Sequence, residues 1–120
     1  MKKIKIAFLS FLGLLVGCEK PATDVSAQAQ MQSTTSIIQA EFEKSDQILT
    51  RYLDALDAAQ TSRADKIQII CHDYPHEYKV GYMKSLLLLK PQAFTETELL
   101  KQLEQAMDFY KEKDHIQCTS

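Results

Sequence analysis

The chain has 120 residues, a formal net charge of −2, no Trp and only three Gly. This length allows one domain with one small hydrophobic core. The scarcity of glycine argues against a β-rich barrel or sandwich with many tight turns, and the many Ala, Leu, Gln, Glu and Lys residues favour helices. We therefore expect an all-α fold.

Charge is distributed unevenly along the chain. Lys2, Lys3 and Lys5 lie in the first seventeen residues, which contain no acid, so that residues 18–120 carry 11 basic and 16 acidic residues, a net of −5. A nucleic-acid-binding domain would have the opposite sign. We expect no nucleic-acid partner.

Residues 1–17 have the pattern of a secretory signal peptide. The three lysines are followed by a mostly apolar run from Ile6 to Val16 and then by Gly17, which matches a basic n-region and a short apolar h-region. A transmembrane helix would need about 20 apolar residues, and this run has about a dozen before Glu19 and Lys20. We expect cleavage of this segment and not a membrane span.

The end of this segment, Leu15-Val16-Gly17-Cys18, resembles the lipobox of bacterial lipoproteins. The resemblance implies cleavage just before Cys18, a diacylglycerol thioether on its thiol and acylation, for example with palmitate, of its new amine. Two or three acyl chains would make membrane attachment permanent. Glu19, in place of the Asp that commonly retains lipoproteins at the inner membrane, favours the outer membrane, facing the periplasm more than the cell surface. An ordinary secreted protein is the alternative.

Residues 18–32 are expected to form a lipidated cysteine and a flexible tether, because they offer almost nothing to bury and have no apolar period. A coil of about 14 residues would hold the following domain roughly 20 Å from the lipid. The α-helical domain is expected at residues 33–120.

The domain is expected to be a small bundle of about four helices. The first runs from the cluster Ser33–Ser36, which offers N-cap oxygens, to near Gln60. Ser62 starts the second helix, and Pro75 ends it and begins a third that closes at Pro91. The capping box Thr95-Glu96-Thr97-Glu98 starts the last helix. Apolar residues recur at helical spacing in each segment.

Three cysteines occur, and lipidation of Cys18 would leave Cys71 and Cys118. An even remainder in an exported protein predicts a disulfide. It would fasten the C-terminus to the bundle. Two free thiols for catalysis or metal binding are the alternative, and the chain has no CxxC motif to support it.

The run from Cys71 to Glu77 is the densest in polar chemistry. His72 and His76 are weak candidates for metal ligands, because a spacing of four places two ligands on one helix face. Pro75 is expected to break that face, which favours a solvated helix junction instead. We therefore expect no metal site and no cofactor.

Tyr74, Tyr78 and Tyr82 repeat every four residues. This spacing is typical of a helix face in a core, and it also suits a binding surface, since Tyr provides contact area at low entropic cost. No nucleophile elbow is present, and acids such as Glu96 and Glu98 have a capping role. We do not expect an enzyme.

Ile70 to Cys118 resembles uncharacterised small lipoproteins of Gram-negative bacteria, which implies no function. We expect a membrane-anchored periplasmic lipoprotein that acts as a non-catalytic protein-binding module with a protein partner in the envelope. Three alternatives stay open: an inhibitor or immunity protein against a cell-wall hydrolase or toxin, a scaffolding component of an envelope complex, and a small metal-binding protein.

Overall fold

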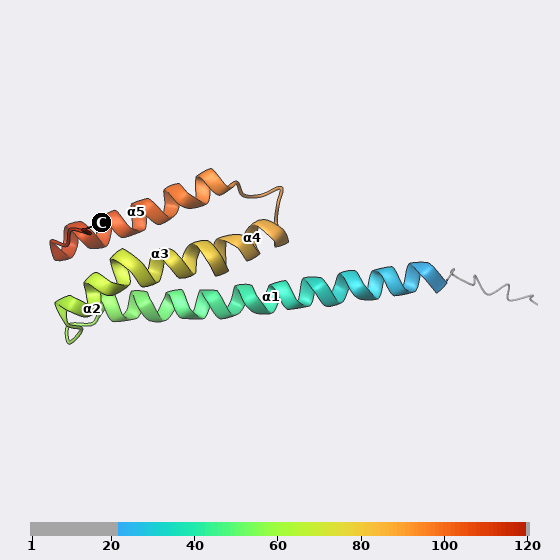
Figure 1. The fold of residues 1–120 in the computed structure, drawn as a ribbon, viewed down its shortest axis with the longest axis horizontal. Helices are drawn as coiled ribbons and strands as arrows, with labels where there is room; N and C mark the ends of the chain where they lie inside the picture. The colour runs from blue at the N-terminus through green and yellow to red at the C-terminus, as the bar shows by residue number, and fades with distance from the viewer. Residues whose placement is uncertain (1–21, 120) are drawn as a thin grey trace, which may run out of the picture.

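The computed structural model describes residues 22–119, which form three long helical rods and contain no strand. The rods are α1 (Ala22–Asp57), a central helix over residues 63–89, and α5 (Glu96–Asp114). Successive rods are antiparallel, and α1 and α5 flank the central helix on opposite sides, so that α1 and α5 run in the same direction (Figure 1). The all-α fold is confirmed. The expected signal peptide at residues 1–17 and lipidated Cys18 lie outside the described residues.

The first helix is longer than expected. We predicted coil up to residue 32, whereas α1 is already helical at Ala22. No Gly or Pro interrupts residues 22–57, and Ala and Gln are good helix formers even where nothing is buried. The hydroxyl groups of Thr34 and Thr35 donate to the carbonyls of Gln30 and Met31, both at 2.9 Å, and do not cap a helix start.

Residues 22–37, here called the α1 arm, extend beyond the other two rods (Figure 1). All side chains from residue 27 to residue 37 are exposed. The described part of the expected flexible tether is therefore a solvated helix. Such a helix is a semi-rigid spacer that rises about 1.5 Å per residue.

The central helix is continuous where we expected two helices separated at Pro75. Its segments follow one another without a gap: α2 (Arg63–Gln68), the π-helical turn η1 (Ile69–Asp73), α3 (Tyr74–Glu77), a second π-helical segment η2 (Tyr78–Met83) and α4 (Lys84–Leu89). Proline lacks an N–H group, and its ring crowds the carbonyl four residues back. The wide turn η1 relieves this crowding, because the N–H of Tyr74 bonds to the carbonyl of Ile69, five residues back. The prediction of a helix boundary at Pro75 is wrong for this reason.

The predicted helix starts at Ser62 and Thr95 are confirmed. Ser62 Oγ accepts from the N–H of Asp65 at 3.1 Å. Thr95 and Glu98 form a complete capping box, in which the N–H of Thr95 donates to Glu98 Oε2 at 3.1 Å and the N–H of Glu98 donates to Thr95 Oγ1 at 3.3 Å. Each bond satisfies an amide that the helix leaves unpaired.

The core lies along the central helix and is closed by one face of α1 and one face of α5. Leu56 of α1, Ile70 of the central helix and Leu99 of α5 are its largest fully buried side chains. α1 approaches the central helix closely at Gly81, where an added Cβ would overlap Ser45 Oγ. Ser45 is buried there and donates to Glu77 Oε1 at 2.7 Å. Glycine is thus required at residue 81 by packing.

Cys71 and Cys118 form a disulfide with a Cα–Cα distance of 5.5 Å, which confirms the predicted pair. The bond joins the central helix to the segment after α5. Ile116, two residues before Cys118, is only 3% exposed and belongs to the core. The C-terminal segment is therefore held by a covalent bond and by an apolar anchor.

Reduction of this disulfide is expected to lower the free energy of unfolding of the full chain by about 4 kcal/mol, because the bond closes a long loop and restricts the unfolded chain. Urea denaturation followed by circular dichroism, with and without reductant, measures the difference. Cys118→Ala without reductant should match the reduced wild type. An unchanged unfolding midpoint on reduction would contradict this estimate.

Candidate functional site

The three tyrosines of the predicted stripe form a row on the central helix. The ring centroids of Tyr74 and Tyr78 are 6.2 Å apart, and those of Tyr78 and Tyr82 are 5.1 Å apart. Phe42 of α1 continues the row, with its centroid 5.1 Å from that of Tyr82. The row depends on the continuous central helix, since a break at Pro75 would have separated Tyr74 from the other two.

These tyrosines form the floor of a groove of about 240 Å³ between α1 and α5, here called the tyrosine groove. Asp46 and Thr50 line its α1 side, and Gln102 and Ala106 line its α5 side. The remaining lining residues are apolar: Leu49, Leu53 and Leu103.

Both interpretations of the tyrosine stripe describe part of this arrangement. Tyr74 and Tyr78 are core residues, with 7% and 6% of their surface exposed, and Tyr82 is half-buried. The stripe is therefore not an exposed patch of three whole rings. Its accessible atoms line a recessed groove, where a partner would meet ring edges and hydroxyl groups.

The hydroxyl groups of these tyrosines differ in their hydrogen bonding. Tyr78 donates to the backbone carbonyl of Leu99 at 3.0 Å in a buried position. Within residues 22–119, neither the Tyr74 nor the Tyr82 hydroxyl has a hydrogen-bond partner. Asp114 Oδ2 is the single buried side-chain polar atom without a partner in the described part of the chain, so the Tyr74 and Tyr82 hydroxyl oxygens reach the surface, where water or a ligand can bond to them.

All three phenols stay neutral near pH 7. Burial raises the pKa of Tyr78 to about 12. Burial, followed by the negative charge of Asp46, raises the pKa of Tyr82. Burial is also the main cause of the raised pKa of Tyr74, with Tyr82, Tyr110 and Asp46 adding to it. The groove therefore offers aromatic rings and neutral hydroxyl groups, and such phenols are too weakly acidic to act as general acids or bases near neutral pH.

Asp46 is the single charged residue among those that line the tyrosine groove. Its side chain is exposed and forms no ion pair within the part of the chain that the structure describes. Its backbone carbonyl accepts from the Thr50 hydroxyl at 2.8 Å. The carboxylate is thus free to meet a ligand. Sequence analysis did not identify Asp46 or Gln102, because nothing local distinguishes them from other solvated residues of α1 and α5.

His72 and His76 both lie exposed on the central helix. Because the helix does not break at Pro75, they share its surface at a spacing of four, contrary to the expected separation. Among the described residues, no group of three or more His, Cys, Asp or Glu side chains is arranged to hold a metal ion. The weak metal candidates therefore gain no third ligand from the fold.

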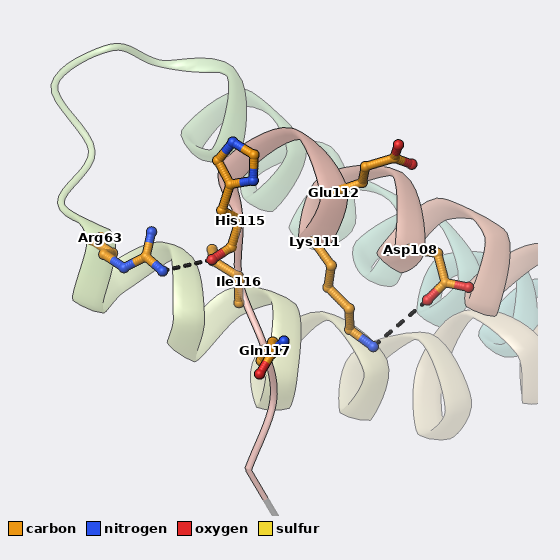
Figure 2. Close-up of a pocket in the computed structure, with 7 residues that line it drawn as sticks. All are labelled: Arg63, Asp108, Lys111, Glu112, His115, Ile116 and Gln117. Atoms are coloured by element: carbon orange, nitrogen blue, oxygen red, sulfur yellow. Dashed lines mark hydrogen bonds and ion pairs between the residues drawn. The ribbon is translucent and has the colours of Figure 1, made fainter.

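A second, larger depression of about 650 Å³ lies at the C-terminal end of α5, and Figure 2 shows the residues that line it. Its basic groups are engaged by the fold. Arg63 donates to the carbonyls of Asp114 and His115 at 2.9 and 2.7 Å, and Lys111 Nζ lies 3.8 Å from Asp108 Oδ1. Arg63 thus caps the C-terminus of α5, where carbonyls lack helical partners. We regard the tyrosine groove as the stronger candidate site.

Comparison with protein-family models, with curated proteins and with solved structures finds no match to this chain. Within the described residues, the helices are too short or too polar to cross a membrane. The candidate function therefore has to be argued from the groove and from the sequence motifs.

Replacement of Tyr78 by Phe is expected to lower the free energy of unfolding by about 1 kcal/mol, because it removes a buried hydrogen bond to Leu99. Tyr74→Phe is the matched control. It removes a hydroxyl that has no protein partner among the described residues and is not a buried unpaired atom, so stability should be nearly unchanged. Urea denaturation of both variants of the full chain measures this. Equal losses in the two variants would show that the Tyr74 hydroxyl is bonded in solution.

Proposed function

We propose that this chain is a lipoprotein of the bacterial envelope whose helical domain binds a protein partner through the tyrosine groove and catalyses no reaction. Lipid on Cys18 would anchor it to the outer membrane, facing the periplasm. The observation that carries the proposal is the groove itself, an open channel between two helices with tyrosines on its floor. Tyrosine is enriched where proteins bind one another, since it combines a large apolar surface with a polar group.

The cysteines support export. Disulfides form and persist in oxidising compartments such as the periplasm and are rare in the cytosol. The bond between Cys71 and Cys118 uses two of the three cysteines in the chain. The third is Cys18, in the segment that resembles a lipobox.

The α1 arm supports a role at a distance from the membrane surface. A helix of 16 residues, the length of the arm, rises about 24 Å along its axis. The tyrosine groove lies along the second half of α1, where Asp46, Leu49, Thr50 and Leu53 line it. An anchor at Cys18 would leave the groove accessible to a partner well above the lipid headgroups.

The lining of the groove supports binding over catalysis. Its three phenols are neutral near pH 7, and Thr50 uses its hydroxyl in a bond to the backbone of its own helix. No histidine or cysteine lines it. These are the features of a recognition surface, where shape and a few polar groups select a partner.

Anchoring is tested by mass spectrometry of the native protein. We expect an N-terminus at Cys18 that carries a diacylglycerol thioether and an amide-linked acyl chain, and recovery of the protein with outer membranes. Cys18→Ser should remain uncleaved and unlipidated, whereas Cys118→Ser, the matched control, should keep its lipid. An intact Met1 and an unmodified Cys18 in the native protein would overturn the anchoring proposal.

Partner binding is tested with a photo-crosslinking amino acid placed at Gln102 of the lipidated chain in intact cells. We expect a discrete crosslinked protein, because Gln102 lines the groove and is exposed. Gln105 is the control, since it is also exposed and lies on α5 outside the groove. Identical products from residues 102 and 105, or no product from residue 102, would contradict binding through the groove.

A further inference from the structure

Within the described residues, a carboxylate, a tyrosine and a cation meet between α1 and α5. Lys113 Nζ of α5 lies 3.2 Å from Asp57 Oδ1 of α1, and the Tyr110 hydroxyl lies 3.5 Å from Asp57 Oδ2. Lys113 Nζ is also 5.6 Å from the centre of the Tyr110 ring, within the range of a cation–π contact. The cation is therefore held by a charge and by an aromatic face at once.

The tyrosine groove also has a carboxylate of α1 beside tyrosines, which come here from the central helix and not from α5, and its lining contains no cation. Asp46 precedes Asp57 by eleven residues, and Gln102 precedes Lys113 by eleven residues. Eleven residues are close to three helical turns, so each pair shares one face of its helix. α1 and α5 run in the same direction (Figure 1), so eleven residues back along each helix is the same displacement from the Asp57–Lys113 ion pair. Asp46 and Gln102 therefore line the same groove. Tyrosine rings are present there, but Gln102 is neutral where Lys113 supplies a charge.

We propose that the tyrosine groove binds a basic side chain of the protein partner, with arginine preferred over lysine. This inference rests on the proposed protein-binding function and names the chemistry of the partner. The guanidinium group is planar, stacks on aromatic rings and donates two parallel hydrogen bonds to a carboxylate. Asp46 supplies the carboxylate, the half-buried Tyr82 supplies the aromatic surface, and the buried Tyr74 offers its hydroxyl group.

Charge and polar groups favour a cation over other ligands. The lining of the groove carries one charge, which is negative, and residues 18–120 have a net charge of −5. The Tyr74 hydroxyl has no partner within residues 22–119, and its oxygen is not among the buried unpaired polar atoms there, so it is accessible to a donor of a ligand. A guanidinium N–H group could donate to this hydroxyl while another donates to Asp46. An anionic ligand would face the uncompensated carboxylate.

The size of the groove favours the end of a side chain over a free small molecule. Pockets for drug-sized ligands have volumes of about 300–1,000 Å³. The tyrosine groove, at about 240 Å³, is smaller. Its two helical walls leave room for one side-chain group presented by a partner that covers the rims.

The proposal is tested by nuclear magnetic resonance of the lipidated full chain in detergent micelles, with ring-labelled tyrosine. The five tyrosines of the chain give few signals to assign. We expect arginine amide to shift the ring signals of Tyr74 and Tyr82 saturably and to leave that of Tyr52 in place. Citrulline amide, which is similar in shape but neutral, should produce no saturable shift. Equal binding of the two probes would overturn the proposal, and tighter binding of lysine amide would overturn the preference for arginine.

Two variants locate the binding charge. Asp46→Asn should weaken arginine amide about threefold to fivefold, as expected for an exposed ion pair. Asp54→Asn, which removes an exposed acid of α1 outside the groove, should leave the affinity unchanged. Equal effects of the two substitutions would show that general charge, and not Asp46, attracts the probe.

A third variant supplies the missing cation within the chain. Gln102→Lys should pair with Asp46 as Lys113 pairs with Asp57, abolish the binding of arginine amide and leave the protein at least as stable as the wild type. Gln105→Lys adds the same charge outside the groove and should leave binding intact. Undiminished binding by Gln102→Lys would contradict the proposed site.

Photo-crosslinking at residue 102 separates this inference from the proposed function. If the same partner is captured equally by the wild type and by Asp46→Asn, the cation proposal is wrong while protein binding through the groove stands. If arginine amide binds in an Asp46-dependent way but residue 102 captures no protein, the cation site stands and the proposed function is wrong. Capture that falls in Asp46→Asn supports both.

Discussion

The continuity of the central helix past Pro75 is the constraint on which the rest of the structure depends. A proline inside a helix costs about 3 kcal/mol, and burial of one large apolar side chain gains about 1.5–3 kcal/mol. Ile70, Tyr74 and Tyr78 are all buried, before and after the proline. The free energy gained by burying these three side chains exceeds the cost of the proline, but only if one continuous helix presents all of them to α1 and α5. The π-helical turn η1 achieves this, because it widens the helix where the ring of Pro75 would otherwise collide.

Features set by neighbouring residues could be predicted from the sequence, and features set by distant contacts could not. The capping box of Thr95 and Glu98 is a local pattern, and Cys71 and Cys118 are the pair that remains when Cys18 is assigned to the segment that resembles a lipobox. The passage of the helix through Pro75 depends on burial against two other rods, which no local rule includes. The helicity of the α1 arm also escapes a rule based on apolar periodicity, because its Ala and Gln residues favour helix even when solvated.

The candidate site shows the same division. The spacing of Tyr74, Tyr78 and Tyr82 predicts the aromatic row, and the structure adds that Tyr74 and Tyr78 are buried and Tyr82 is half-buried. The walls of the groove could not be predicted. Asp46 and Gln102 are 56 residues apart, and they line one groove because α1 and α5 run in the same direction on either side of the central helix. Asp46 and Asp57 are separated by the same number of residues as Gln102 and Lys113. This equal spacing relates the two places to each other only because α1 and α5 run in the same direction.

The two places where side chains of α1 and α5 come together therefore differ by one charge. At Asp57 the ion pair with Lys113 joins the two helices directly. An exposed ion pair contributes at most about 1 kcal/mol, so a lysine in place of Gln102 would cost the fold nothing and would stabilise it slightly. Stability alone gives no reason for a neutral residue across the groove from Asp46. The neutral Gln102 is understandable if a partner supplies the cation, because a lysine of the chain itself would occupy the groove and exclude the partner's side chain.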